Sequence, residues 1–189
     1  MAPTDAASFN SAARWIDVDS GWFGRLACLE VLSVAERVHL ARIALQQQWI
    51  CDVEDTEAKR AAIESLGLHV ATTNLGYLIV SGSPTMTEYF AFRGDVLSLV
   101  ETGVLYGYPP SAVIAYTGIT PSRPPHESWM TPATYFLGGA YSTVQSDRER
   151  AAFESQWGQL AKCAPELSRK AEQAFQRWMS EEARQLRQD

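Results

Sequence analysis

Apolar residues recur every three to four positions along several stretches of the chain, and this spacing predicts amphipathic helices. One such helix should begin after the capping-box pattern Ser33–Glu36 and run for about four turns to Trp49. A second should begin at Asp55, as its cap, and end at Gly67. The first third of the chain is therefore expected to be largely helical.

The period then changes to one that favours strands. Residues 68–72 and 77–81 are rich in β-forming residues, and the segment between them offers Asn74 and Gly76 for positive φ angles, so a β-hairpin is expected. Residues 15–19 alternate apolar and acidic side chains, which suggests a short strand or an extended edge. Residues 89–92 fit either a third strand or the start of a helix.

Helical patterns return towards the C-terminus. A helix is expected over 95–102, closed by Gly103, and another from Pro110 to Tyr116. Thr131–Pro132 is typical of a cap followed by a first helical residue, and residues 146–149 form a second capping-box pattern. Apolar faces on both sides of Pro165 predict a helical hairpin or one kinked long helix; they consist of Phe153, Trp157, Leu160, Ala164, Leu167, Ala171, Ala174 and Trp178.

These elements predict a mostly helical α+β fold, with a small β-hairpin or short antiparallel sheet and a C-terminal helical hairpin. A length of 189 residues suits one compact domain. We expect residues 1–10 to be a loose N-terminal leader and residues 11–189 to be a single globular domain.

Composition and charge indicate which partners and which location in the cell to expect. The net charge of −6, without a basic stripe, argues against a nucleic-acid partner. No apolar run reaches the roughly 18 residues of a membrane helix, and the first residues lack the pattern of a secretory signal, so we expect a cytoplasmic protein with no membrane partner. Thirteen arginines against three lysines suggest a GC-rich bacterial genome. The acidic run 52–57 is interpreted as the solvated start of a helix.

The densest motif is residues 103–116, a turn of glycine, tyrosine and proline that opens into an apolar helix. Tyr106, Tyr108 and Tyr116 could donate hydrogen bonds to a substrate carbonyl or to a developing oxyanion. Each could equally be a packing residue whose hydroxyl meets a backbone partner. Three tyrosines together make this segment the best candidate for the edge of a pocket.

The proline-rich stretch 118–131 follows directly, and long loops of this kind often bind ligands. It carries His126 and Glu127, a pair suited to acid/base catalysis in which Glu127 orients the histidine. Arg123 and Trp129 flank the pair and are candidates for substrate binding, and Trp129 could cover a ligand. The alternative is a polar pair on an ordinary surface loop.

Motifs for cofactors and metals are absent from the sequence. There is no dinucleotide or phosphate-binding glycine motif, and the three histidines show no ligand spacing, so we expect no cofactor and no metal. Asp17 and Asp19 could face the same way on a strand and hold a divalent ion, or they could be purely structural. The three cysteines are scattered and are expected to be free thiols.

The segment Gly103-x-Leu105-x-Gly107-Tyr108-Pro109, followed by Ala115-Tyr116, resembles a motif in an uncharacterised prokaryotic family. That family has a glycine-tyrosine-proline turn, two cysteines and a short helix that ends in an aromatic residue. This chain has Ser111 and Ala112 in place of the cysteines, so no thiol or metal role is implied here. The resemblance covers about fourteen residues and implies a turn that leads into a helix.

Three functions fit these observations. The first is a small enzyme that acts on a small organic molecule by acid/base chemistry, with His126 as acid or base and Tyr106 or Tyr108 polarising the substrate. The second is an interaction module, or homo-oligomer, that uses the C-terminal helices. It depends on exposure of the stripe Leu167, Ala171 and Trp178. The third is a small-molecule binder without turnover. The isomers of the peptide bonds before Pro109 and Pro110 stay open.

Overall fold

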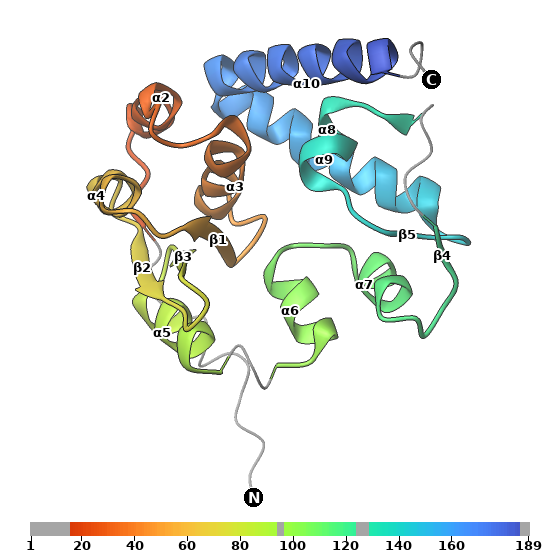
Figure 1. Ribbon diagram of the computed structural model, residues 1–189, viewed down its shortest axis with the longest axis horizontal. Helices are drawn as coiled ribbons and strands as arrows, with labels where there is room; N and C mark the ends of the chain where they lie inside the picture. Colours follow the sequence, from red (N-terminus) through yellow and green to blue (C-terminus); the bar gives the residue numbers. More distant parts are fainter. Residues whose placement is uncertain (1–15, 94–96, 124–128, 186–189) are drawn as a thin grey trace, which may run out of the picture.

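The computed structural model describes residues 16–93, 97–123 and 129–185 (Figure 1). The strands in this part of the chain are β1 (Ile50–Glu54), β2 (His69–Thr72), β3 (Tyr77–Ser81), β4 (Ser122–Arg123) and β5 (Tyr141–Ser142). The helices are α2 (Trp22–Cys28), α3 (Val34–Ala44), α4 (Glu57–Ser65), α5 (Pro84–Arg93), α6 (Leu99–Leu105), α7 (Pro110–Tyr116), α8 (Pro132–Leu137), α9 (Ser146–Cys163) and α10 (Pro165–Gln185). The fold is the expected mostly helical α+β arrangement.

A three-stranded antiparallel sheet in the order β1-β3-β2 forms one side of the molecule. The expected hairpin is confirmed as β2 and β3, with Gly76 at φ 78° in the connection. Strand β1 was not expected, because its acidic residues were assigned to a helix start. That interpretation was wrong for Asp52 and Glu54, which alternate with buried Cys51 and Val53 along the strand.

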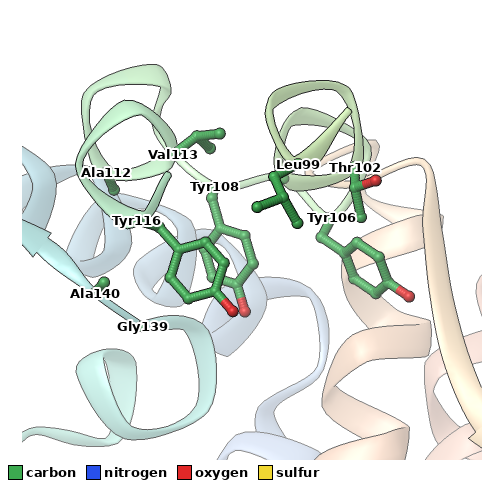
Figure 2. Close-up of a pocket in the computed structure, with 10 residues that line it drawn as sticks. Leu99, Thr102, Tyr106, Tyr108, Ala112, Val113, Tyr116, Gly139 and Ala140 are labelled. Atoms are coloured by element: carbon green, nitrogen blue, oxygen red, sulfur yellow. The ribbon is translucent and has the colours of Figure 1, made fainter. Parts of the chain in front are cut away.

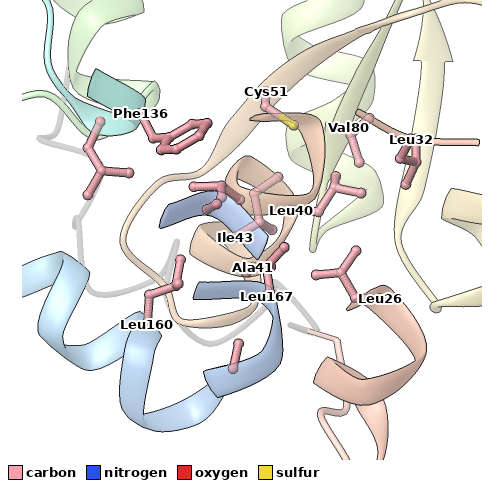
Figure 3. Close-up of a cluster of buried hydrophobic side chains, with 14 of the residues drawn as sticks. Leu26, Leu32, Leu40, Ala41, Ile43, Cys51, Val80, Phe136, Leu160 and Leu167 are labelled. Carbon is pink, nitrogen blue, oxygen red and sulfur yellow. The ribbon is translucent and has the colours of Figure 1, made fainter. Parts of the chain in front are cut away.

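The two faces of the sheet pack against different helices. Cys51, Val53, Leu78 and Val80 join the main core with helices α2, α3, α4, α9 and α10 (Figure 3). On the opposite face, Ile50 and Ile79 pack with Phe90 of α5, so residues 89–92 are helical rather than a third strand. Because side chains alternate along a strand, Asp52 shares this second face with Ile50. That face leads towards α6 and the candidate site.

Helices α9 and α10 form the predicted C-terminal hairpin, with Pro165 as the first residue of α10 (Figure 1). Leu167 and Ala171 are fully buried in the main core, and Phe175 is 4% exposed. Trp178 is partly buried and lies 4.8 Å from the Tyr135 ring, centroid to centroid. The apolar stripe Leu167, Ala171 and Trp178, on which the interaction module depends, is thus largely buried inside the monomer.

Several helix boundaries differ from the expected ones. Helix α3 ends at Ala44, and Gln46 takes φ 58°, because the chain must turn there to enter β1. Helix α4 is capped by Thr56, whose hydroxyl accepts from the Lys59 amide, and not by Asp55. Asp55 instead pairs with Arg60.

Two further N-termini are corrected. Ser98 caps α6 through a capping box with Glu101, so Gly103 lies inside the helix that it was expected to close. Ser146 is the first residue of α9 and not a capping box, because its hydroxyl accepts from Arg123. Glu149, the other half of that pattern, reaches back to the Ser142 amide. The side chains of Ser146 and Glu149 therefore bind tertiary partners and do not form the capping box.

Other expectations are resolved as follows. Helix α7 begins at Pro110, and α8 is capped by Thr131 with Pro132 as its first residue, both as predicted. Residues 16–19 form no strand. No helix in the described part of the chain is both long and apolar enough to cross a membrane. No cis peptide bond occurs at any described residue.

Candidate functional site

The turn between α6 and α7 places two tyrosines with well-defined backbone geometry. After Tyr106, the C-cap of α6, Gly107 takes φ 77°. The Gly107 amide donates to the Val104 carbonyl at 2.9 Å, and the Tyr108 amide donates to the Gly103 carbonyl at 3.1 Å. These two hydrogen bonds define a Schellman motif, which is how a glycine after the C-cap commonly ends a helix. Tyr106 and Tyr108 are therefore the residues on either side of Gly107 in one tight turn.

Helices α6 and α7 approach each other closely beyond this turn. A Cβ atom added to Gly103 would lie 2.8 Å from both Cγ atoms of Val113, so the glycine is needed for this contact. Pro110, as the first residue of α7, starts that helix without leaving an unpaired amide. The approach of the two helices forms one wall of a cavity.

The cavity, which we call the tyrosine pocket, has a volume of about 350 Å³ (Figure 2). Its remaining wall is the segment that joins α8 to β5. The residues lining it are Leu99, Thr102, Gly103, Tyr106, Tyr108, Ala112, Val113, Tyr116, Gly139 and Ala140. An apolar wall with a few polar groups is typical of small-molecule sites. The three candidate tyrosines of the sequence are thus brought together in one place.

Two phenols of the tyrosine pocket, those of Tyr106 and Tyr108, are held in their neutral form. Burial raises the pKa of Tyr108, the cationic Arg42 acts in the opposite direction, and Asp52 and then Tyr116 raise the pKa further. The pKa of Tyr106 is also raised, by burial first and then by the negative charge of Asp52 on β1. Near neutral pH both groups therefore act as hydrogen-bond donors and not as bases.

Arg42 of α3 lies behind Tyr108 and is fully buried. Its Nη2 atom donates to the Gly107 carbonyl at 3.3 Å and to Gln156 Oε1 at 3.2 Å, and burial lowers its pKa to about 10. Within the described residues it has no carboxylate partner and its Nε atom has no acceptor. This guanidinium ties the turn at Gly107 to α9 and places a positive charge close to the Tyr108 phenol.

The proline-rich segment is only partly described. His126 and Glu127, the expected catalytic pair, lie outside the described residues. Arg123 and Trp129 lie on either side of them, with the Arg123 guanidinium 4.3 Å from the Trp129 ring centroid. Trp129 also packs edge-on against Tyr141. Neither residue lines the tyrosine pocket.

The aspartate pair of the N-terminal segment has a structural setting. Asp19 accepts from the Gly21 amide at 2.7 Å and pairs with Arg25 at 2.8 Å, just before α2, while Asp17 is exposed. No group of three potential metal ligands occurs among residues 16–93, 97–123 and 129–185. Cys28, Cys51 and Cys163 are free thiols.

Sequence reasoning missed four of the ten residues that line the tyrosine pocket. Leu99 and Thr102 lie on α6, and Gly139 and Ala140 come from a segment that begins 23 residues after Tyr116, the end of the tyrosine motif. The glycine pair 138–139 is typical of the end of a helix, but no pattern in the sequence indicates which part of the protein faces these glycines. Only the packing of the α8–β5 connection against α7 decides it.

No protein-family model, no curated protein and no solved structure matches this chain. Its function must therefore be inferred from the geometry of the site.

Proposed function

We propose that this protein binds a small, largely apolar organic molecule that carries a hydrogen-bond acceptor, and that it does so in the tyrosine pocket. One observation carries the proposal: Tyr106, Tyr108 and Tyr116 all line a single apolar cavity, in which the Tyr106 ring points away from the other two (Figure 2). A volume of about 350 Å³ lies within the range of ligand pockets and suits a single aromatic ring with a short substituent.

The residues of the pocket wall would make two kinds of contact with such a ligand. Leu99, Ala112 and Val113 offer apolar contacts, which favour a ring or a short alkyl chain. The hydroxyl groups of Tyr108 and Tyr116 supply donors to a carbonyl or ether oxygen. Tyr106 is oriented towards Asp52 and serves mainly as a wall. A buried acceptor that meets a donor loses little on leaving water, whereas one without a donor is penalised.

The test compares acetophenone, which has a ring and a carbonyl, with ethylbenzene, which lacks the acceptor. We expect saturable chemical-shift changes in the amide NMR spectrum for acetophenone, centred on α6 and α7. Replacing Tyr108 and Tyr116 together by Phe should reduce the preference for acetophenone over ethylbenzene by about tenfold, the worth of one to two hydrogen bonds. An unchanged preference in the double variant would contradict the role of the phenols.

A steric variant tests the location. Ala140→Leu adds volume inside the pocket and should abolish binding of both compounds. Ala151→Leu makes the same change on the exposed side of α9 and should leave binding intact. An equal loss of binding in the two variants would contradict the location of the ligand in the tyrosine pocket.

Acid/base catalysis on the bound molecule is the second candidate. Arg123 and Trp129, which flank His126 in the sequence, are anchored to Ser146 and Tyr141. Tyr141 directly follows Ala140 of the pocket wall, so the two described residues that flank His126 in the sequence are attached next to this wall. In this second candidate function, His126 would take a proton from the carbon next to a ligand carbonyl while a phenol polarises that carbonyl.

Exchange of the acetophenone methyl protons in D₂O separates the two candidates. An exchange rate above that of buffer, lost in His126→Ala, would support the enzyme. Saturable binding with exchange at the rate of buffer would leave the protein a binder without this activity.

A further inference from the structure

A second cavity, which we call the α9 groove, lies between the α6–α7 turn, β5 and α9. Its volume is about 880 Å³, and among the described residues Tyr108 is the one that lines both this groove and the tyrosine pocket. Its wall contains both apolar and charged groups, unlike that of the tyrosine pocket. The charged ones are Arg148 and Glu149, neighbours at the start of α9.

Glu149 is a buried carboxylate with one oxygen satisfied. The side chain is 1% exposed, and its Oε2 atom accepts from the Ser142 amide at 2.9 Å. Its Oε1 atom is buried and has no hydrogen-bond partner in the described part of the chain. A buried carboxylate is costly without a cation or a full set of donors, and the positive end of the α9 dipole offsets only part of this cost. Glu149 lines the groove, so a small rotation of its carboxylate would bring the unpaired Oε1 atom to a donor on a ligand.

Arg148 is the complementary group. Its side chain is exposed, lines the same groove and forms no ion pair with any described residue. Two turns from Glu149, the Gln156 amide is oriented by Arg42, which occupies its Oε1 atom and leaves its NH₂ group as a donor for the groove. A buried anion, an exposed cation and a fixed amide donor therefore line one cavity.

We propose that the α9 groove binds the zwitterionic head of an α-amino acid with an apolar side chain. Its ammonium group would donate to Glu149 Oε1, and its carboxylate would face Arg148 and the Gln156 amide. Val104, Ile114 and Val144 on the same wall provide an apolar surface for the side chain. A simple cation would be repelled by Arg148, and a simple anion would be repelled by Glu149, so the pair of charges selects a zwitterion.

Three matched probes test this selection: L-leucine, 3-methylbutylamine, which lacks the carboxylate, and 4-methylpentanoate, which lacks the ammonium group. We expect saturable binding of L-leucine by NMR titration, weaker binding of the amine, and none of the acid. No saturation by L-leucine at about 50 mM, or equal binding of the acid, would overturn the proposal.

Variants then assign the two charges. Glu149→Gln should weaken L-leucine binding at least about tenfold, because a hydrogen bond to a charged group is lost. Asp147→Asn makes the same change of charge at a 93% exposed side chain that does not line the groove, and should have no effect. Binding to Glu149→Gln as tight as to the wild type would refute the assignment.

Arg148→Gln keeps the proposal testable if the Glu149 variant does not fold, since Arg148 is exposed. It should weaken L-leucine binding and leave that of 3-methylbutylamine unchanged or tighter. A parallel loss for both probes would contradict a carboxylate contact at Arg148. Tyr116→Phe, which alters the tyrosine pocket alone, should not change L-leucine binding, so failure of this proposal and failure of the proposed function are distinguishable.

Discussion

Replacement of Gly107 by alanine perturbs the turn on which the tyrosine pocket depends. Gly107 has φ 77°, and a Cβ atom there would lie 2.2 Å from the Gln47 carbonyl oxygen, 2.9 Å from Gln48 Cβ and 3.0 Å from Arg42 Nη2. Two of these atoms belong to the segment that joins α3 to β1, which is held by a hydrogen bond from the Trp49 amide to the Leu105 carbonyl. The added methyl group must therefore move backbone and not only a flexible side chain.

The magnitude follows from two separate costs. The left-handed backbone conformation costs an alanine about 1–2 kcal/mol. Overpacking against the α3–β1 segment adds about 1–3 kcal/mol, so Gly107→Ala should lower the free energy of unfolding by roughly 2–5 kcal/mol. Gly118 is the matched control, because it has φ 79° and nothing within 4 Å of an added Cβ atom. Gly118→Ala should show the first cost alone.

Urea unfolding of the two variants and the wild type provides the measurement. The entropy that a glycine adds to the unfolded chain is common to both positions and cancels in their difference. We expect Gly107→Ala to be less stable than Gly118→Ala by about 1–3 kcal/mol, or about 2–4 °C in Tm for each kcal/mol. Equal destabilisation would refute the steric part of the reasoning.

Two further predictions concern packing and pH. Gly103→Ala should destabilise the protein, because the added Cβ atom would clash with Val113, and Val113→Ala should relieve this clash. A double-mutant cycle of the two substitutions should therefore give a coupling energy of about 1 kcal/mol or more. Additive effects on the free energy of unfolding would contradict the close contact of α6 with α7. Tyr141→Phe should keep or increase the free energy of unfolding, because the buried Tyr141 hydroxyl has no hydrogen-bond partner among the described residues. Burial raises the pKa of Tyr141 to about 12, above the value near 10 of an unfolded chain, so the wild type should lose stability from pH 10 to about 12. The Phe variant should lose less over that window, and identical stability curves above pH 10 would contradict the shift.

Local sequence was sufficient wherever the deciding contacts lie within one turn of the chain. The hairpin β2–β3 is an example, since strand-forming residues flank Asn74 and Gly76. The start of α7 is another, because Pro110 begins that helix through neighbouring backbone groups alone. The end of α6 is not, since the helix continues past Gly103 to Leu105. Three tyrosines spaced around the turn before α7 were recognisable as the edge of a pocket.

Partners distant in sequence decided the rest. Strand β1 exists because Cys51 and Val53 pair with β3, and its acidic residues concealed this. Ser146 and Glu149 look like a capping box, yet Arg123 and the Ser142 amide bind them instead. Glu149 Oε1 is thereby left without a partner among the described residues, and Glu149 lines the α9 groove. A contact of this kind depends on which surfaces meet after folding, and the order of residues along the chain does not contain it.

The sequence by itself thus determined the class of fold, the helical hairpin at the C-terminus and the turn that carries Tyr106 and Tyr108. The tertiary structure alone decided that Gly139 and Ala140 close the tyrosine pocket and that Arg42 lies behind Tyr108. The physical reason is the sequence separation of the interacting residues. Caps, turns and periodicity depend on residues a few positions apart, whereas a cavity is made by side chains that only the packing of the whole chain brings together.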